Sequence, residues 1–288
     1  MKILVTGATG QLGAKVVEAL LASVPAEQLA VSVRDPQKAS ALSERGVDVR
    51  KGDFDDPASL DTAFAGVDRL LIVSTQGDND TRIRQHMAAV EAAQRAGVKF
   101  IAYTSVVNAA SNPLALAPVH KATEEAIAKT GIPYAFLRNN WYIENETGSI
   151  QGILAGAPLV TSAGDGKVGW ATRGDYAQAA AAVLAGNGHE NKIYELSGPM
   201  LTHDELAQRI GEVLGREVPV QHVDDAAYAE AMRGAGVPEP VVPFLVSIQS
   251  AIREGALDVP SSDLEALLGR PVTPIVDAIS DIVKELQA

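Results

Sequence analysis

The stretch that decides the fold is Ile3-Leu4-Val5-Thr6-Gly7-Ala8-Thr9-Gly10-Gln11-Leu12-Gly13, an apolar run followed at once by a glycine-rich run. It predicts a strand, a tight loop and the start of a helix. Gly7 lets the chain turn off the strand, Gly10 lets the backbone approach a ligand, and Gly13 lets the helix lie close to the sheet. The unpaired N–H groups and the dipole at the start of such a helix favour phosphate groups.

This loop therefore predicts a dinucleotide site, because a strand precedes it and an amphipathic run follows it. The alternative is a tight strand-to-helix turn that binds nothing. The residues expected to contact the dinucleotide here are Gly7, Thr9, Gly10, Gln11, Leu12 and Gly13.

Outward from the loop, short apolar runs alternate with amphipathic runs. We expect strands over residues 2–6, 29–33, 47–51, 69–74, 100–104 and 134–137. We expect helices over residues 12–23, 37–44, 58–64, 80–96 and 119–130. Regular βαβ alternation with short connections is typical of a doubly wound parallel sheet, so the predicted class is a Rossmann-like α/β fold.

Beyond about residue 140 the alternation loosens. We expect strands over 159–161, 192–196 and 218–222, and helices over 176–184, 203–214, 226–233, 243–254 and 272–286. No linker-like run separates the two parts. We therefore expect one domain over 1–288, with a cofactor-binding core over 1–140 and a small α/β lobe over 141–288 that mainly covers the substrate cleft.

The composition excludes several kinds of site. There are 36 acidic and 24 basic residues and a net charge of −12, which argues against a nucleic-acid partner. There is no cysteine, so disulfides, thiolate metal sites and cysteine nucleophiles are excluded. The chain starts with a predicted strand rather than a leader, and residues 176–185 are too short to span a bilayer. We expect a cytoplasmic protein with no membrane partner, and a homodimer is compatible with the sequence.

Arg34 ends the second predicted strand, where this class of fold binds the adenosine ribose. An acidic residue at this place selects NAD, whereas an arginine binds a 2′-phosphate and selects NADP. Asp35 is the competing candidate, but it precedes Pro36 and suits the N-cap of the next helix. The sequence therefore favours NADPH over NADH.

Other strand ends supply further cofactor candidates. After the third strand, Asp53 either accepts a hydrogen bond from the adenine amino group or belongs to an ordinary turn. Phe54 either covers the adenine ring or is a buried aromatic residue. After the fourth strand, Ser74 and Thr75 are expected to border the middle of the cofactor. At the end of the fifth strand, the nicotinamide is expected to lie beside Tyr103, Thr104 and Ser105.

The helix after the fifth strand places His120 and Glu124 four residues apart, on one face. They form either a hydrogen-bonded surface pair or part of a site in which His120 contacts the substrate or donates a proton. No third ligand has a spacing that indicates a metal, so none is expected. After the sixth strand, the expected walls of a pocket for a planar ligand are Asn139, Trp141 and Tyr142.

Together these motifs resemble the NmrA-like branch of the atypical short-chain dehydrogenase/reductases. The resemblance rests on the glycine spacing, Val33-Arg34, Gly52-Asp53-Phe54, Tyr103-Thr104-Ser105 and Leu137-Arg138-Asn139. Within that branch the chain is similar to bacterial NADPH:quinone oxidoreductases and triphenylmethane dye reductases. The resemblance implies a Rossmann-like fold, NADPH, and two-electron reduction without flavin.

The chain departs from most short-chain dehydrogenases, because His120 and Glu124 stand where a Tyr-x-x-x-Lys pair is usual. A ketone's hydride adduct is a strong base that needs a positioned acid, whereas a quinone's adduct is a phenolate whose conjugate acid has a pKa of roughly 10. We therefore expect a reductase of quinones or similar planar acceptors. The alternatives are a redox-sensing dinucleotide-binding regulator, or a reductase of dye, imine, azo or enone substrates.

Overall fold

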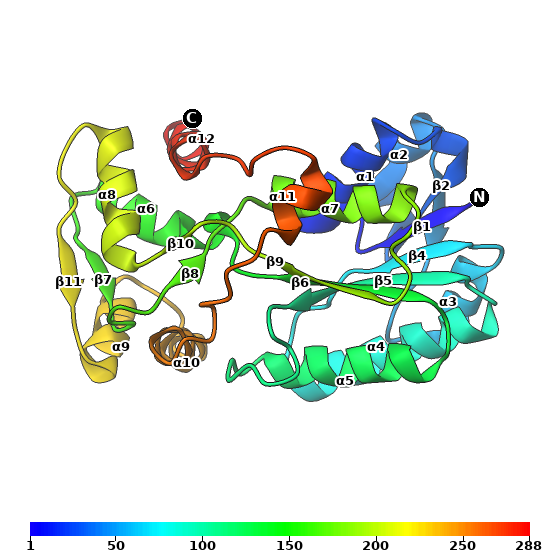
Figure 1. Cartoon of the computed structure of the whole chain (residues 1–288), viewed down its shortest axis with the longest axis horizontal. Coiled ribbons are helices and arrows are strands. Elements are labelled where there is room, and N and C mark those ends of the chain that lie inside the picture. Colours follow the sequence, from blue (N-terminus) through cyan, green and yellow to red (C-terminus); the bar gives the residue numbers. More distant parts are fainter.

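The glycine loop lies at the carboxyl end of an inner strand of a seven-stranded parallel sheet in this computed structural model, which describes residues 1–288. The sheet order is β3-β2-β1-β4-β5-β6-β9, and every neighbouring pair is parallel (Figure 1). The strands are β1 (Ile3–Thr6), β2 (Leu29–Val33), β3 (Asp48–Lys51), β4 (Arg69–Ile72), β5 (Phe100–Val106), β6 (Tyr134–Asn139) and β9 (Lys192–Leu196). The order reverses between β1 and β4, and ligands bind at such a switch point.

Helices cover both faces of this sheet (Figure 1). On one face lie α1 (Gln11–Leu21), α2 (Ser40–Glu44), α7 (Arg173–Ala185) and α11 (Asp263–Leu268). On the other face lie α3 (Pro57–Phe64), α4 (Asn79–Arg95) and α5 (Ala117–Lys129). The central strands are buried on both faces, which explains why they are continuous apolar runs.

The rest of the chain forms a lobe beyond the carboxyl ends of the strands (Figure 1). Its helices are α6 (Thr147–Leu154), α8 (His203–Leu214), α9 (Asp225–Gly234), α10 (Val242–Arg253) and α12 (Ile275–Gln287). Two small sheets pair β7 (Leu159–Thr161) with β11 (Val220–His222), and β8 (Val168–Gly169) with β10 (Met200–Leu201). Short 3-10 turns occupy Ala26–Gln28 and Pro36–Ala39 on either side of β2, and Ile143–Glu146 after β6. The lobe has its own apolar core around the fully buried Trp170.

The predicted Rossmann-like class is confirmed by this sheet order. Three segments beyond residue 140 join the sheet rather than the lobe: β9 is the edge strand next to β6, the alanine-rich α7 packs along α1, and α11 packs against α7. The sequence pattern did not predict α6, α11, β8 or β10. No helix combines the length and the apolar character needed to cross a membrane.

Candidate functional site

The glycine loop has the geometry that a phosphate site requires. Gly7 has a φ of +62°, which favours glycine, and its carbonyl accepts a 2.9 Å hydrogen bond from the Gly10 N–H group. A Cβ on Gly13 would lie 2.2 Å from that same carbonyl oxygen, so only glycine allows α1 to start this close to the loop. The first turn of α1 has no capping side chain and no acidic residue, which leaves its N–H groups available to an anion.

A single cleft of about 1380 Å³ runs from this loop, past the strand ends, to the lobe. Seventeen of the residues predicted from the sequence line it: Gly7, Thr9, Gly10, Gln11, Leu12, Gly13, Arg34, Asp53, Phe54, Ser74, Thr75, Thr104, Ser105, His120, Asn139, Trp141 and Tyr142. The structure thus brings together residues that are widely separated in the sequence. What each of them contacts stays a prediction.

Tyr103 is the predicted residue that does not line the cleft. Its side chain is fully buried on the face of β5 that α4 and α5 cover. Side chains alternate between the faces of a strand, and this position faces the helices rather than the cleft. Its hydroxyl lies 2.9 Å from His120 Nδ1, so Tyr103 acts on the site from behind, through residues that line the cleft. The expectation that it borders the nicotinamide is corrected accordingly.

At the end of β2, the placement of Arg34 and the contacts of Asp35 agree with the phosphate-binding role expected for Arg34 and the capping role expected for Asp35. The carboxylate of Asp35 accepts a 3.1 Å hydrogen bond from the Gln37 N–H group, and Pro36 opens the following 3-10 turn. Asp35 is therefore the predicted cap. Arg34 is exposed on the wall of the cleft, where its guanidinium is free to meet a phosphate.

A buried histidine lies behind the loop that follows β4. The main-chain N–H of Thr75 donates to His86 Nε2 at 3.0 Å. Because a main-chain N–H only donates, Nε2 carries no proton, and His86 Nδ1–H donates to Thr123 Oγ1 at 2.9 Å. Burial, followed by the charge of Arg82, lowers the pKa of His86 to about 3, so this ring is neutral.

His120 is fixed in the same way. Its Nε2 lies 3.4 Å from the guanidinium of Arg82, which only donates, so Nε2 is unprotonated and Nδ1–H donates to Tyr103. Burial, and then the charge of Arg82, hold the pKa of His120 well below its usual value. His120 therefore has no proton to release into the cleft through Nε2.

The alternative of a His120–Glu124 surface pair is wrong, because both side chains are buried and they do not bond to each other. Glu124 accepts a 2.6 Å hydrogen bond from Ser105 Oγ and a bidentate pair from Arg138 at 2.9 and 2.7 Å. Arg138 also bonds to Glu195 at 2.7 Å. The carboxylate at the usual lysine place thus joins α5 to β5 and β6, while Arg138 extends the link to β9.

The far half of the cleft combines apolar and aromatic side chains with several polar groups. The Trp170 Nε1–H donates to Glu146 Oε1 at 3.1 Å, and burial raises the pKa of that carboxyl. Asn139 Nδ2 donates to the Tyr142 hydroxyl at 3.1 Å, which leaves the buried Asn139 Oδ1 without a protein partner. Burial raises the pKa of Tyr228, on the same wall, to about 12.

Sequence reasoning missed many of the polar residues that line the cleft, among them Arg82, Gln85, Glu146, His203 and Tyr228. One signal was present, because Arg82 and His86 lie on the same stripe of α4 as the buried Ala89 and Ala93. A polar pair on the buried stripe of a helix indicates partners inside the protein.

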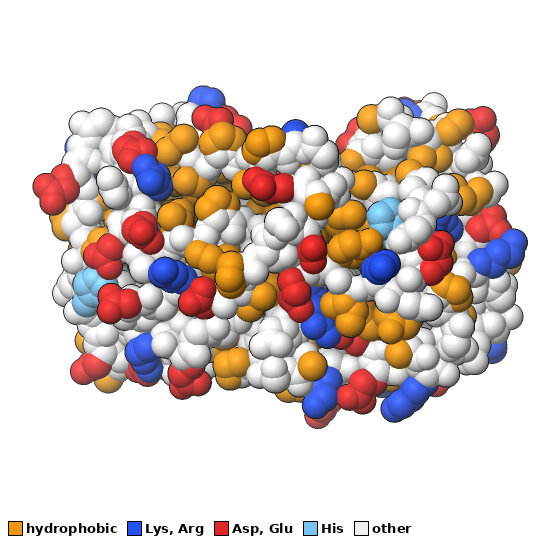
Figure 2. All heavy atoms as spheres, in the orientation of Figure 1, with side chains coloured by type: hydrophobic (Ala, Val, Ile, Leu, Met, Phe, Trp, Pro, Cys, Tyr) orange, Lys and Arg blue, Asp and Glu red, His pale blue; other side chains and the backbone are white.

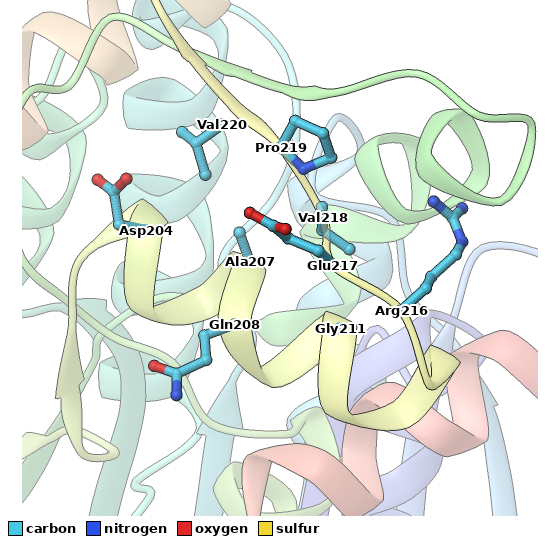
Figure 3. A pocket seen from close by; sticks show the side chains of 9 residues that line it. All are labelled: Asp204, Ala207, Gln208, Gly211, Arg216, Glu217, Val218, Pro219 and Val220. Carbon is cyan, nitrogen blue, oxygen red and sulfur yellow. The ribbon is translucent and has the colours of Figure 1, made fainter.

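A second hollow of about 520 Å³ lies in the lobe between α8 and the segment leading into β11. Figure 3 shows charges of both signs around it, with Asp204, Glu217 and Arg216. It shares no residue with the large cleft. On the face drawn in Figure 2, Lys and Arg side chains are interspersed with Asp and Glu and form no continuous basic patch.

The family follows from comparison with known proteins. The model of the NmrA-like family matches residues 1–270. The chain belongs to the NmrA-like family. Quinone oxidoreductase 2 of Escherichia coli (strain K12) is 41% identical over 281 residues, which cover 97% of this chain and 98% of that protein.

Two solved structures of NmrA-like relatives have the same fold as this chain. Citrobacter sp. triphenylmethane reductase complexed with NADP(H) has a TM-score of 0.94 and 44% identity, covering 98% of this chain and 100% of the other. The NADPH-dependent quinone oxidoreductase of Escherichia coli complexed with NADPH has a TM-score of 0.93 and 41% identity, covering 98% and 99%. The predicted family resemblance and fold class are thereby confirmed.

Proposed function

We propose that this NmrA-like protein is an NADPH-dependent reductase that passes a hydride directly to a quinone or a similar planar acceptor, without flavin. The observation that carries the proposal is the continuity of the cleft, in which a phosphate-binding loop and an aromatic, largely apolar wall share one cavity. Two relatives, a triphenylmethane reductase and a quinone oxidoreductase, were solved with bound NADP(H) or NADPH. They support both the cofactor and the class of acceptor in this proposal.

The cofactor end fits NADPH. Gly7 to Gly13 and the start of α1 would hold the pyrophosphate, and Arg34 would bind the 2′-phosphate, which disfavours NADH. NADPH supplies the hydride when bound. Its adenine end would lie near Asp53 and Phe54, its middle along Ser74 and Thr75, and its nicotinamide end along Thr104 and Ser105.

The acceptor end fits a flat molecule that needs little acid catalysis. Asn139, Trp141 and Tyr142 would form its walls, and His120 would contact its edge as a neutral ring. The protein's task is to stack the acceptor on the nicotinamide and exclude water while the hydride moves. The proton that completes reduction would come from water, because a quinone's adduct is only a phenolate.

The test is consumption of NADPH and of NADH by the purified protein across a panel of quinones, triarylmethane dyes, azo compounds and enones. We expect turnover of quinones or dyes with a strong preference for NADPH. A protein that neither binds NADPH nor oxidises it with any acceptor would contradict the proposal. Tight binding of NADPH and NADP⁺ with no turnover would instead indicate a redox-sensing regulator.

We also propose a cytoplasmic location, a homodimer and no nucleic-acid partner. The cysteine-free and acidic composition supports the first and last of these. Sedimentation equilibrium of the purified chain tests the dimer, and a molecular mass equal to one chain at micromolar concentration would contradict it.

A further inference from the structure

Arg82 is a buried cation on the wall of the cleft. It lies near the start of α4 and is 9% exposed. Its Nη2 donates to Ser74 Oγ at 2.9 Å and lies 3.4 Å from His120 Nε2. Its Nε is buried and has no hydrogen-bond partner in the protein. The side chain is thus held in place but only partly satisfied.

No carboxylate lies within 4.0 Å of this guanidinium. Burial lowers the pKa of Arg82, and the one opposing group is the phenol of Tyr103, whose own pKa is raised by burial so that it carries no charge at neutral pH. An arginine nevertheless stays protonated at neutral pH. Burying an unpaired charge costs several kcal/mol, and buried charges in proteins are normally paired. Because Arg82 lines the cleft, an anion bound in the cleft would pair with this charge and remove the cost of burying it.

The position of Arg82 decides which anion this is. The phosphate groups of the cofactor would lie at the glycine loop after β1 and at Arg34 after β2. Arg82 instead contacts Ser74, after β4, and His120 on α5, after β5. In the order β2-β1-β4-β5 these lie on the opposite side of the switch point from Arg34. This is the nicotinamide end, where the cofactor has no phosphate.

We propose that Arg82 binds the acceptor oxygen that becomes negative when a quinone takes up the hydride; this rests on the proposed function. In that step the transferred C–H bond of dihydronicotinamide breaks, and both of its electrons leave with the hydrogen. NADPH is oxidised to NADP⁺ and the quinone is reduced to a hydroquinone monoanion. Water then supplies the proton. Arg82 transfers no proton and acts as a fixed positive donor, which stabilises charge that develops in the transition state.

His120 becomes a positioning residue in this scheme. Its unprotonated Nε2 faces the guanidinium, and Tyr103 fixes its tautomer from behind. The histidine therefore orients Arg82 rather than protonating the product. The same geometry predicts a selectivity. A neutral quinone gains negative charge and is assisted, whereas a cationic triarylmethane dye loses its charge on reduction and gains nothing from Arg82.

The experiment compares Arg82→Met, which removes the charge at similar length, with Arg82→Lys, which keeps it. Arg95→Met is the matched control, because Arg95 is an exposed residue of the same helix that pairs with Asp61. For each protein we would measure the Kd of NADPH, and kcat and KM with a soluble quinone and with a cationic triarylmethane dye.

We expect Arg82→Met to lower kcat for the quinone by about 10²- to 10³-fold, the usual effect of losing one oxyanion donor. The Kd of NADPH should stay within about twofold, where a tenfold change would be about 1.4 kcal/mol. The rate with the dye should not fall, because Arg82 offers a cationic acceptor no attraction. Arg82→Lys should recover part of the loss, and Arg95→Met should match the wild type. Equal losses with both acceptors, or a loss that follows a weaker NADPH Kd, would overturn the proposal.

A second readout does not need turnover. A nitrophenol bound in the NADP⁺ complex mimics the reduced acceptor, and its absorbance reports its ionisation. We expect the wild type to lower the pKa of the bound phenol and Arg82→Met to lose about one pKa unit of that effect or more, as for removal of an adjacent opposite charge. An identical bound pKa in both proteins would refute the role of Arg82 even if the wild type reduces neither acceptor. A wild-type protein that reduces neither acceptor, but still lowers the pKa of the bound phenol through Arg82, would instead refute the proposed function.

Discussion

Three buried histidines make the folded protein sensitive to mild acid: His120, described above, and two others. His86 is fully buried beneath the cleft, and His203 is 2% exposed at the start of α8 with its Nδ1 unpartnered. Burial is the main cause that lowers the pKa of His86 to about 3 and of His203 to about 4. In the unfolded chain each has a pKa of about 6.5.

A lowered folded pKa means that the unfolded chain binds a proton that the folded chain cannot. The stability that depends on these neutral rings is therefore complete above pH 6.5 and is lost as the pH falls toward the folded pKa values. Between pH 7 and pH 5 each unfolded histidine becomes almost fully protonated while the folded ones stay neutral. Linkage then gives a loss of about 2 kcal/mol each for His86 and His203, or about 4 kcal/mol for the pair, and the lowered pKa of His120 adds to that loss.

Urea-induced unfolding at pH 7, 6 and 5 measures this loss. His203→Gln should reduce the difference between pH 7 and pH 5 by about 2 kcal/mol, whatever it does to stability at pH 7. His222→Gln is the control, because His222 is half exposed beside Asp204 and its removal should not reduce the difference. A loss below about 1 kcal/mol in the wild type, or an unchanged loss in His203→Gln, would refute the reasoning.

Three further predictions concern the cleft. Arg34→Ala should reduce the preference for NADPH over NADH in kcat/KM by about 10- to 100-fold, the value of one charge-assisted contact with phosphate, and an unchanged ratio would show that the 2′-phosphate lies elsewhere. Gly13→Ala should abolish tight NADPH binding in equilibrium titrations and lower the free energy of unfolding by about 1–3 kcal/mol, because its Cβ would meet the Gly7 carbonyl at 2.2 Å; unchanged affinity would contradict the phosphate-loop assignment. Glu146→Gln should lower kcat/KM for a cationic dye by about tenfold and leave a neutral quinone unaffected, because this carboxylate has no cationic partner on the acceptor wall; equal effects on both acceptors would refute an electrostatic role.

The strands and helices of the sheet half were predictable from the sequence because the signals for them are local. Each central strand is buried on both faces and reads as an apolar run, and Gly7 and Gly13 mark a turn that few other residues allow. Strand β9 was recognised as a strand but not as the sheet edge. It pairs with β6, which is distant in sequence. Its exposed Lys192 and Ile193 also interrupt the apolar run by which the other strands of this sheet are recognised.

The site was predictable only where the backbone alone brings residues together. Residues at the carboxyl ends of parallel strands share one edge, so Ser74, Thr104 and Asn139 meet in the cleft as expected. Tyr103 was misplaced because its position in the alternation of β5 turns it toward α4 and α5. Arg82 was missed because only the packing of α4 on the sheet brings a helical side chain beside Ser74. Such packing is not a local property of the sequence.

The central claim is direct hydride transfer from NADPH to the acceptor, and isotope transfer tests it most directly. NADPH carrying deuterium at both C4 positions would be incubated with the protein and a cationic triarylmethane dye, whose reduced product holds the incoming hydrogen in a C–H bond that does not exchange with water. The account predicts one deuterium on the central carbon of the product, by mass spectrometry, with a flavin-free protein. A product without deuterium would contradict it.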